Sequence, residues 1–334
     1  MAGFNPSNTT HLSRLKKARE DAYKKLAPFR SERFNGLREL VGKCYGHEGT
    51  ERINPVNLVL LTVQSYCQTL VSKSPEFDVN TKWKGLTPYV NLFKLGLADA
   101  IEEMNLRRTI EEMVVDAMFG QSVVKVGMES YADGVRGYLH KAATPFAETV
   151  GLNNWFHDIY APCWERCQYM GDRYDLSLDE IRENPLFDKD VRERVVASTN
   201  ASNIATQGNT SNPTRLGSGS PLNATRLYEE VQVWDVWLPR EKLMLTVCDH
   251  QDIPPLRIMD WEGPEQGPYH WCAYQTVPGN TMPLAPIAGW IDLHTIVNQL
   301  VRKLGRQAER QRTVLAYQEG AGSEAERILH AGDD

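Results

Sequence analysis

Residues 286–311, PIAGWIDLHTIVNQLVRKLGRQAERQ, are the stretch that decides the fold of this chain. Apolar side chains and one histidine recur here at spacings of three and four, which predicts a single amphipathic helix roughly 35 Å long. The members of this stripe are Ile287, Ile291, His294, Val297, Val301, Leu304 and Ala308. The stripe narrows toward its C-terminal half, where basic residues take over.

Five basic residues occupy eleven positions at the end of the segment: Arg302, Lys303, Arg306, Arg310 and Arg312. Cations near a helix C-terminus complement the helix dipole, but five of them exceed that need. The surplus indicates a partner. An elongated helix that is half apolar and has a basic end suits a ring of packed subunits.

The whole chain has 334 residues, of which 41% are apolar and 24% are charged, enough to bury a sizeable core in two or three domains. Its net charge of −6 averages unlike segments: +6 over residues 1–43, −11 over 44–285, +3 over 286–312 and −4 over 313–334. A basic segment on an acidic body indicates contact with nucleic acid or with an acidic neighbouring subunit. A solvated helix face is the alternative for the N-terminal run.

Cellular placement follows from what the sequence lacks. No apolar run approaches the ~18 residues that a membrane span needs. Residues 5–8 are polar where a signal peptide would be apolar, and six cysteines are too few for a disulfide scaffold. We therefore predict a protein that neither spans a membrane nor is secreted, in a reducing compartment.

The remaining patterns predict a mixed α+β chain. Helices are expected at residues 11–27, 31–41, 56–72, 88–104 and 107–119, and strands at 122–128, 138–143, 227–238, 243–247 and 270–274. Ser177 and Glu180 have the spacing of a capping box. Residues 198–225 are dominated by small and polar residues and predict a long flexible surface loop. The first helix has so thin an apolar stripe that we expect it to dock on another surface, either of this chain or of another.

Enzyme signatures are lacking. The sequence has no phosphate-binding loop, dinucleotide fingerprint, nucleophile elbow or His-Glu-x-x-His motif, so we predict neither an enzyme nor a cofactor. One set of side chains could hold zinc: Cys163, Cys167, Cys248, His250, His270 and Cys272. Their intervals differ from the two-residue knuckles of structural zinc sites. A zinc-dependent enzyme is the alternative hypothesis.

Four patches then occur in a recognisable order. Residues 54–75, NPVNLVLLTVQSYCQTLVSKSP, precede an extended Phe-Asp-Val, and residues 116–126 read DAMFGQSVVKV. Residues 153–162 with 169–183 predict a strand and a helix, and residues 274–318 a turn, the long helix and a strand. As an ordered set, these patches resemble the portal (head-to-tail connector) proteins of tailed bacteriophages over most of residues 50–320.

The resemblance implies a non-enzymatic homo-oligomeric ring, typically a dodecamer, at the portal vertex of the virion capsid, assembled in the host cytoplasm. Double-stranded DNA would pass through its channel during viral genome packaging and DNA ejection. The implied partners are the terminase large subunit, the head-tail adaptor and the major capsid protein, with no membrane. Another virion structural protein, such as an adaptor or a scaffold, is a further alternative.

The resemblance also implies a division of the chain. Residues 1–50 would form a basic N-terminal helical arm, 51–285 a wing, 286–311 the first stem helix and 312–334 the start of the clip. Family members continue into a second stem helix, a tunnel loop and a crown. Either the sequence is a fragment or a different closing element replaces these parts, and we expect the crown and the tunnel loop to be absent here. The basic stem residues could pair subunits, face DNA or meet the motor, and we expect pairing for Arg302 and Arg306.

Overall fold

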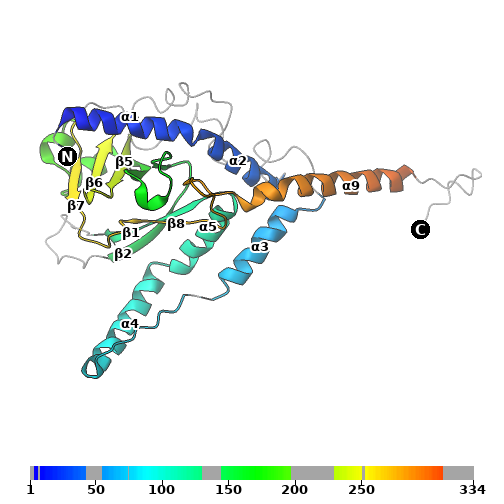
Figure 1. The fold of residues 1–334 in the computed structure, drawn as a ribbon, viewed down its shortest axis with the longest axis horizontal. Helices are drawn as coiled ribbons and strands as arrows, with labels where there is room; N and C mark the ends of the chain where they lie inside the picture. The colour runs from blue at the N-terminus through cyan, green and yellow to red at the C-terminus, as the bar shows by residue number, and fades with distance from the viewer. Residues whose placement is uncertain are drawn as a thin grey trace, which may run out of the picture.

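The computed structural model describes residues 4–6, 8–42, 55–73, 75–129, 144–196, 229–249 and 253–310. These residues form two antiparallel sheets with helices that pack on them and extend from them (Figure 1). The prediction of a mixed α+β fold is confirmed. The predictions for residues 138–143, 198–225 and 312–334 lie outside the described residues.

The larger sheet has five strands, and their spatial order follows the chain. They are β3 (Trp155–His157), β4 (Met170–Ser177), β5 (Glu230–Leu238), β6 (Leu243–Cys248) and β7 (Arg257–Asp260). The predicted hairpin is confirmed, because Leu238 pairs with Leu243 across the turn between β5 and β6. Trp155, Phe156 and Trp237 are fully buried beside this sheet and form the centre of its core.

The smaller sheet has three strands in the order β2 (Thr144–Val150), β1 (Ser122–Glu129), β8 (Tyr269–Cys272). Both outer strands run antiparallel to β1, with Val123 opposite Val150 on one side and opposite Trp271 on the other. Strand β8 therefore joins a segment close to the long helix to a strand that lies more than a hundred residues earlier in the chain.

Helix α1 (Thr9–Lys25) lies against the larger sheet and is followed directly by α2 (Ala27–Val41). Figure 1 shows α1 along one side of the sheets and α2 continuing from it toward the start of the long C-terminal helix. Leu15 and Leu26 pack in the same apolar cluster as Trp234. The thin stripe of the first helix thus docks on the sheet of its own chain, where burial of a few large side chains is sufficient.

The remaining helices and 3₁₀ turns follow in chain order. They are α3 (Leu58–Leu70), α4 (Thr87–Glu103), α5 (Leu106–Met118), α6 (Leu178–Glu183), α7 (Lys189–Arg192) and α9 (Ile291–Arg310), with short 3₁₀ turns η2 (Lys84–Leu86), η3 (Trp164–Arg166) and η5 (Pro286–Gly289). The predicted capping box at Ser177 is present at the start of α6. In Figure 1, α4 is an arm that points away from the sheets, and α9 begins close to α3 and extends from the body in a different direction. None of the described helices is both long enough and apolar enough to cross a bilayer.

A buried ionic cluster joins the two sheets. Lys125 on β1 donates hydrogen bonds from Nζ to Asp172 on β4 at 2.9 Å and to Asp235 on β5 at 2.8 Å. The hydroxyl of Tyr269 on β8 donates to Asp172 at 2.5 Å, and the hydroxyl of Thr246 on β6 donates to Asp235 at 2.7 Å. Side chains from five strands therefore meet in one cluster around this ammonium group.

The charges in this cluster depend on one another. Burial disfavours the ammonium form of Lys125, but the two carboxylates outweigh it, so the pKa of Lys125 is raised. Burial raises the pKa of Asp172, and Lys125 offsets only part of that effect. Because two carboxylates share one cation, removal of the cation would leave two buried negative charges with only hydroxyl donors.

Replacing Lys125 tests this arrangement. We expect Lys125→Met to lower the free energy of unfolding by about 3–5 kcal/mol at pH 7, the cost of breaking a buried ion pair by removing one partner. Lys94→Met is the matched control, because Lys94 pairs with Asp78 at 3.2 Å on the surface, where solvent screening leaves such a pair little effect on stability. Urea unfolding of both variants gives the comparison, and equal losses would contradict a central role for Lys125.

Candidate functional site

The segment that leads into α9 is fixed to the body before the helix begins. After β8, the chain turns at residues 277–280, where the amide of Asn280 donates to the carbonyl of Val277. Thr281 and Met282 are each only 2% exposed, and Ile287 in η5 packs with Val59 of α3 in a separate apolar cluster. The first residue of α9 is therefore placed by a chain segment that cannot swing freely.

His157 holds this segment through a defined tautomer. The indole N–H of Trp155 donates to Nδ1 of His157 at 3.0 Å, and Nε2 lies 2.9 Å from the hydroxyl oxygen of Thr281. Because an indole can only donate, the proton of the neutral ring must lie on Nε2, which donates to Thr281. Burial, with a smaller contribution from the positive charge of Arg30, lowers the pKa of His157 to about 3.

The side of α9 that faces the body carries a polar anchor. Asn298 is 1% exposed and brackets the backbone of Val56: its Oδ1 accepts from the amide at 3.1 Å, and its Nδ2 donates to the carbonyl at 3.0 Å. One turn earlier, the buried His294 lies 3.4 Å from a carboxylate oxygen of Glu39 on α2. These contacts fix the N-terminal half of α9 against the chain between α2 and α3.

Asn57 completes the joint. Its Oδ1 accepts from the amide of Leu60 and caps the start of α3, while its Nδ2 donates to the carbonyl of Leu40 at 2.8 Å near the end of α2. Two neighbouring positions, Val56 and Asn57, thus connect three helices. Backbone groups that would otherwise be buried without partners are satisfied by asparagine side chains.

Helix α9 has a second apolar stripe, which faces away from the body. Its members are Leu293, Ile296, Leu300 and Leu304, each 50–62% exposed. The stripe predicted from the sequence is partly confirmed, because His294 is buried and Val297 and Val301 are half-buried, but Leu304 and Ala308 lie in the exposed part. The second stripe was not predicted from the sequence. The spacing of three, four and four residues between its members, from Leu293 to Leu304, is the pattern that indicates it.

The basic residues lie in a third sector of α9. At about 100° per residue, positions 302, 306 and 310 lie roughly 160°, 120° and 80° around the helix from residue 300, between the side that faces the body and the exposed apolar stripe. Arg302 is half-buried, whereas Lys303 and Arg306 are exposed. Arg310 ends the helix and Arg312 lies outside the described residues. The helix therefore presents a face to the body, an exposed apolar stripe and an exposed basic sector.

The candidate zinc ligands are spread over the fold. Cys163 and Cys167 flank η3, Cys248 ends β6, and His270 and Cys272 lie on β8, while His250 falls outside the described residues. Within the part of the chain that the structure describes, no three His, Cys, Asp or Glu side chains lie close enough together to hold a metal ion.

Two of these thiols are also unreactive as nucleophiles. Burial is the main factor that raises the pKa of both Cys167 and Cys248 to about 12. A thiol must lose its proton to act as a nucleophile, and these two retain it at neutral pH.

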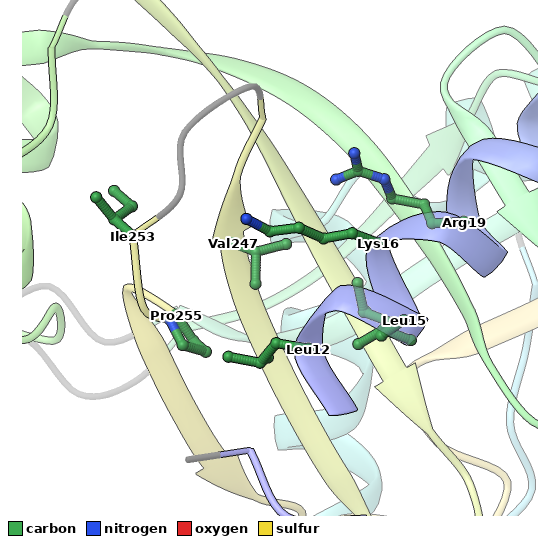
Figure 2. A pocket seen from close by; sticks show the side chains of 8 residues that line it. Leu12, Leu15, Lys16, Arg19, Val247, Ile253 and Pro255 are labelled. Atoms are coloured by element: carbon green, nitrogen blue, oxygen red, sulfur yellow. The ribbon is translucent and has the colours of Figure 1, made fainter. Parts of the chain in front are cut away.

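Two hollows in the surface are candidate ligand sites. Figure 2 shows the first, where Leu12 and Leu15 of α1 face Val247 and Pro255; its volume of about 10 Å³ is no larger than one water molecule needs. The second, about 500 Å³, is open and includes Asp158, whose carboxylate already accepts from the backbone amides of Tyr160 and Gln168. Neither hollow brings a nucleophile together with a base.

The N-terminal basic run makes contacts within the chain. Arg19 pairs with Asp249 at 2.6 Å, and Arg33 pairs with Asp116 at 2.6 Å. Arg30 donates to three backbone carbonyls, and burial lowers its pKa to about 10, so it stays charged at neutral pH. These three arginines bind α1 and α2 to the body, which accounts for part of the positive charge without an external anion.

Comparison of the sequence with known protein families and with curated proteins finds no match. Function is therefore inferred from the residues and their geometry.

Replacing Asn298 tests the anchor of α9. Asn298→Ala removes both partners of the Val56 backbone, which we expect to cost about 1–3 kcal/mol locally. Amide hydrogen exchange should become faster at the start of α3 and along α9, and stay unchanged in β5 and β6. Gln299→Ala, at the exposed next position, is the control. Equal exchange rates in the two variants would show that the anchor is not needed.

The pKa of His157 predicts a pH dependence. Its pKa is about 3 in the folded chain against 6.5 in the unfolded chain, so only the unfolded state gains this proton as the pH falls below 6.5. Stability from this group is complete above pH 6.5 and is lost toward pH 3. Between pH 7 and pH 5.5 the loss is about 1 kcal/mol.

The variant His157→Gln should lack this part of the pH dependence in urea unfolding at the two pH values. His270→Gln serves as the control, because it removes an imidazole that is exposed on β8. A wild-type slope in His157→Gln would contradict the buried neutral ring.

Proposed function

We propose that this chain is a portal-type subunit, which assembles with copies of itself into a closed ring whose channel admits double-stranded DNA. The observation that carries the proposal is α9: a 20-residue helix anchored at one end, with an exposed apolar stripe and a separate basic sector. The ordered resemblance of four sequence patches to portal proteins supports the same assignment, with α9 as the first stem helix.

The physical argument begins with the exposed stripe. Four large apolar side chains are exposed along one helix, where their contact with water is unfavourable. A contiguous apolar surface of this kind marks an interaction site. A contact between two different surfaces of identical chains joins them head to tail, and such contacts close into a ring when the rotation between copies allows it. A helix whose N-terminal half is fixed to the body, as α9 is by Asn298 and His294, keeps the rotation between copies constant.

The charge distribution agrees with passage of DNA rather than storage of it. Each phosphate neutralised by a protein cation adds salt-dependent affinity, so a channel lined throughout with basic residues would retain the duplex. The body between residues 44 and 285 carries −11, whereas net positive charge lies at residues 1–43, with +6, and at residues 286–312, with +3. In this proposal the ring stands at the capsid vertex with the major capsid protein, and binds first the terminase large subunit and then the head-tail adaptor.

Mass photometry of the purified full chain tests ring formation. We expect one dominant species at a fixed multiple of the 37.9 kDa subunit, about twelve, with a central hole of duplex width, about 20 Å, in negative-stain images. An adaptor or scaffold would give another stoichiometry. Monomers at every protein concentration would contradict the proposal.

Charge reversal on α9 tests the role of the basic sector. If Arg306 pairs neighbouring subunits, Arg306→Glu should reduce the ring fraction at least severalfold at low salt, because an attractive charge becomes repulsive. Lys242→Glu is the matched control, since Lys242 is also exposed but lies at the β5–β6 turn. Normal rings that package DNA poorly would instead place Arg306 in contact with DNA.

A further inference from the structure

The arm formed by residues 83–103, which we call the α4 arm, has no buried side chain in its helix. Its large apolar residues are 48–73% exposed: Trp83, Leu86, Tyr89, Leu92, Phe93 and Leu95. Helix α4 contacts its neighbours in the chain, η2 and α5, and its Lys94 pairs with Asp78. An exposed apolar surface of this extent marks an interaction site.

The charges of the α4 arm are the opposite of those on α9. Near its C-terminal end, α4 carries Asp99, Glu102 and Glu103, and its only basic residue is Lys94, so its net charge is −2. Helix α9 carries a net +2 over its twenty residues. Pairing of two α4 helices or of two α9 helices brings like charges together, whereas α4 with α9 brings opposite charges together.

The order of residues along the two helices also matches. In both, the exposed apolar side chains begin in the N-terminal half, and apart from Lys94 on α4 and Asp292 on α9 the charged residues lie in the C-terminal half. Placed side by side in the same direction, the apolar halves meet each other and the acidic end of α4 meets the basic end of α9. Their lengths, about 25 and 30 Å at 1.5 Å per residue, are similar enough for contact along the whole of α4.

Gly96 removes a steric obstacle to close packing. It lies on α4 one turn after Leu92 and Phe93, and a β-carbon placed there would meet no atom within 4 Å. Glycine in a helix interior costs about 1 kcal/mol relative to alanine, so its presence on an exposed helix gives the chain no local benefit. It does allow another helix to approach α4 closely.

The two helices cannot cover each other within one chain. Figure 1 shows that α4 and α9 project from the body in diverging directions, α4 downward and away from the sheets and α9 to the right. The partner that has the required surface is therefore a second copy. We propose that α9 of one copy docks in parallel along α4 of the next copy. This inference rests on the proposed function, because it names the two surfaces whose head-to-tail contact would close the ring.

Photo-cross-linking of the full chain tests the contact. A benzophenone side chain replaces Leu92, and this protein is assembled with an equal amount of ¹⁵N-labelled chain that has no probe. We expect cross-links from position 92 to ¹⁵N peptides within residues 291–310. Because Leu92 is 69% exposed, the replacement leaves the fold intact, which circular dichroism checks. A probe at Glu265, 91% exposed on its side chain, is the control and should not yield these peptides.

Mass photometry of the same samples separates the two ideas. Rings whose position 92 cross-links to any other segment, to its own chain or to nothing overturn the α4–α9 contact and leave the proposed ring in place. Absence of rings overturns the proposed function, and the contact with it. An inter-copy cross-link to residues 291–310 in rings supports both.

Exchange of charges gives an independent readout. Glu103→Lys should lower the ring fraction at least threefold at low salt, and combination with Arg306→Glu should recover most of it, because the pair is restored with reversed signs. Glu265→Lys is the charge-matched control. If Glu103→Lys behaves like Glu265→Lys, or if the double variant assembles no better than either single variant, the contact is wrong.

Discussion

The buried ammonium group of Lys125 is the interaction on which the rest of the arrangement depends. It joins β1 in the smaller sheet to Asp172 and Asp235 in the larger one, so the two sheets have one relative position. Strand β8 pairs with β1, and the chain that leaves β8 leads through Thr281 into α9. The direction in which α9 leaves the body is thus set by an ion cluster between the sheets and by the polar joint at Asn298.

Local features of the fold could be predicted from the sequence because they depend on neighbouring residues. The helices, the β5–β6 hairpin and the capping box at Ser177 follow from periodicity and turn chemistry, and the structure confirms them. The pairing of β8 with β1 could not be predicted in this way, since it joins residues far apart in the chain and no local pattern records it. The same holds for Lys125, which appears in the sequence as one lysine in a valine-rich strand.

The candidate site was predicted in part. The sequence predicts α9 and its basic residues. It predicts one apolar stripe along the helix, and the exposed stripe from Leu293 to Leu304 was not predicted. Which of two registers faces the body depends on tertiary contacts, here the polar contacts of His294 and Asn298 rather than an apolar face. The positive charge of Arg19, Arg30 and Arg33 could not be assigned to internal partners from sequence alone, because those partners lie 80 to 230 residues away.

A three-dimensional reconstruction of the assembled full chain by electron cryo-microscopy is the most direct test of this account. It should show a closed ring in which α9 from every subunit surrounds a central opening wide enough for a DNA duplex, about 20 Å or more, with each body outside its own helix. An assembly in which α9 lies on the outer surface, or an open or two-fold oligomer without a central opening, would contradict it.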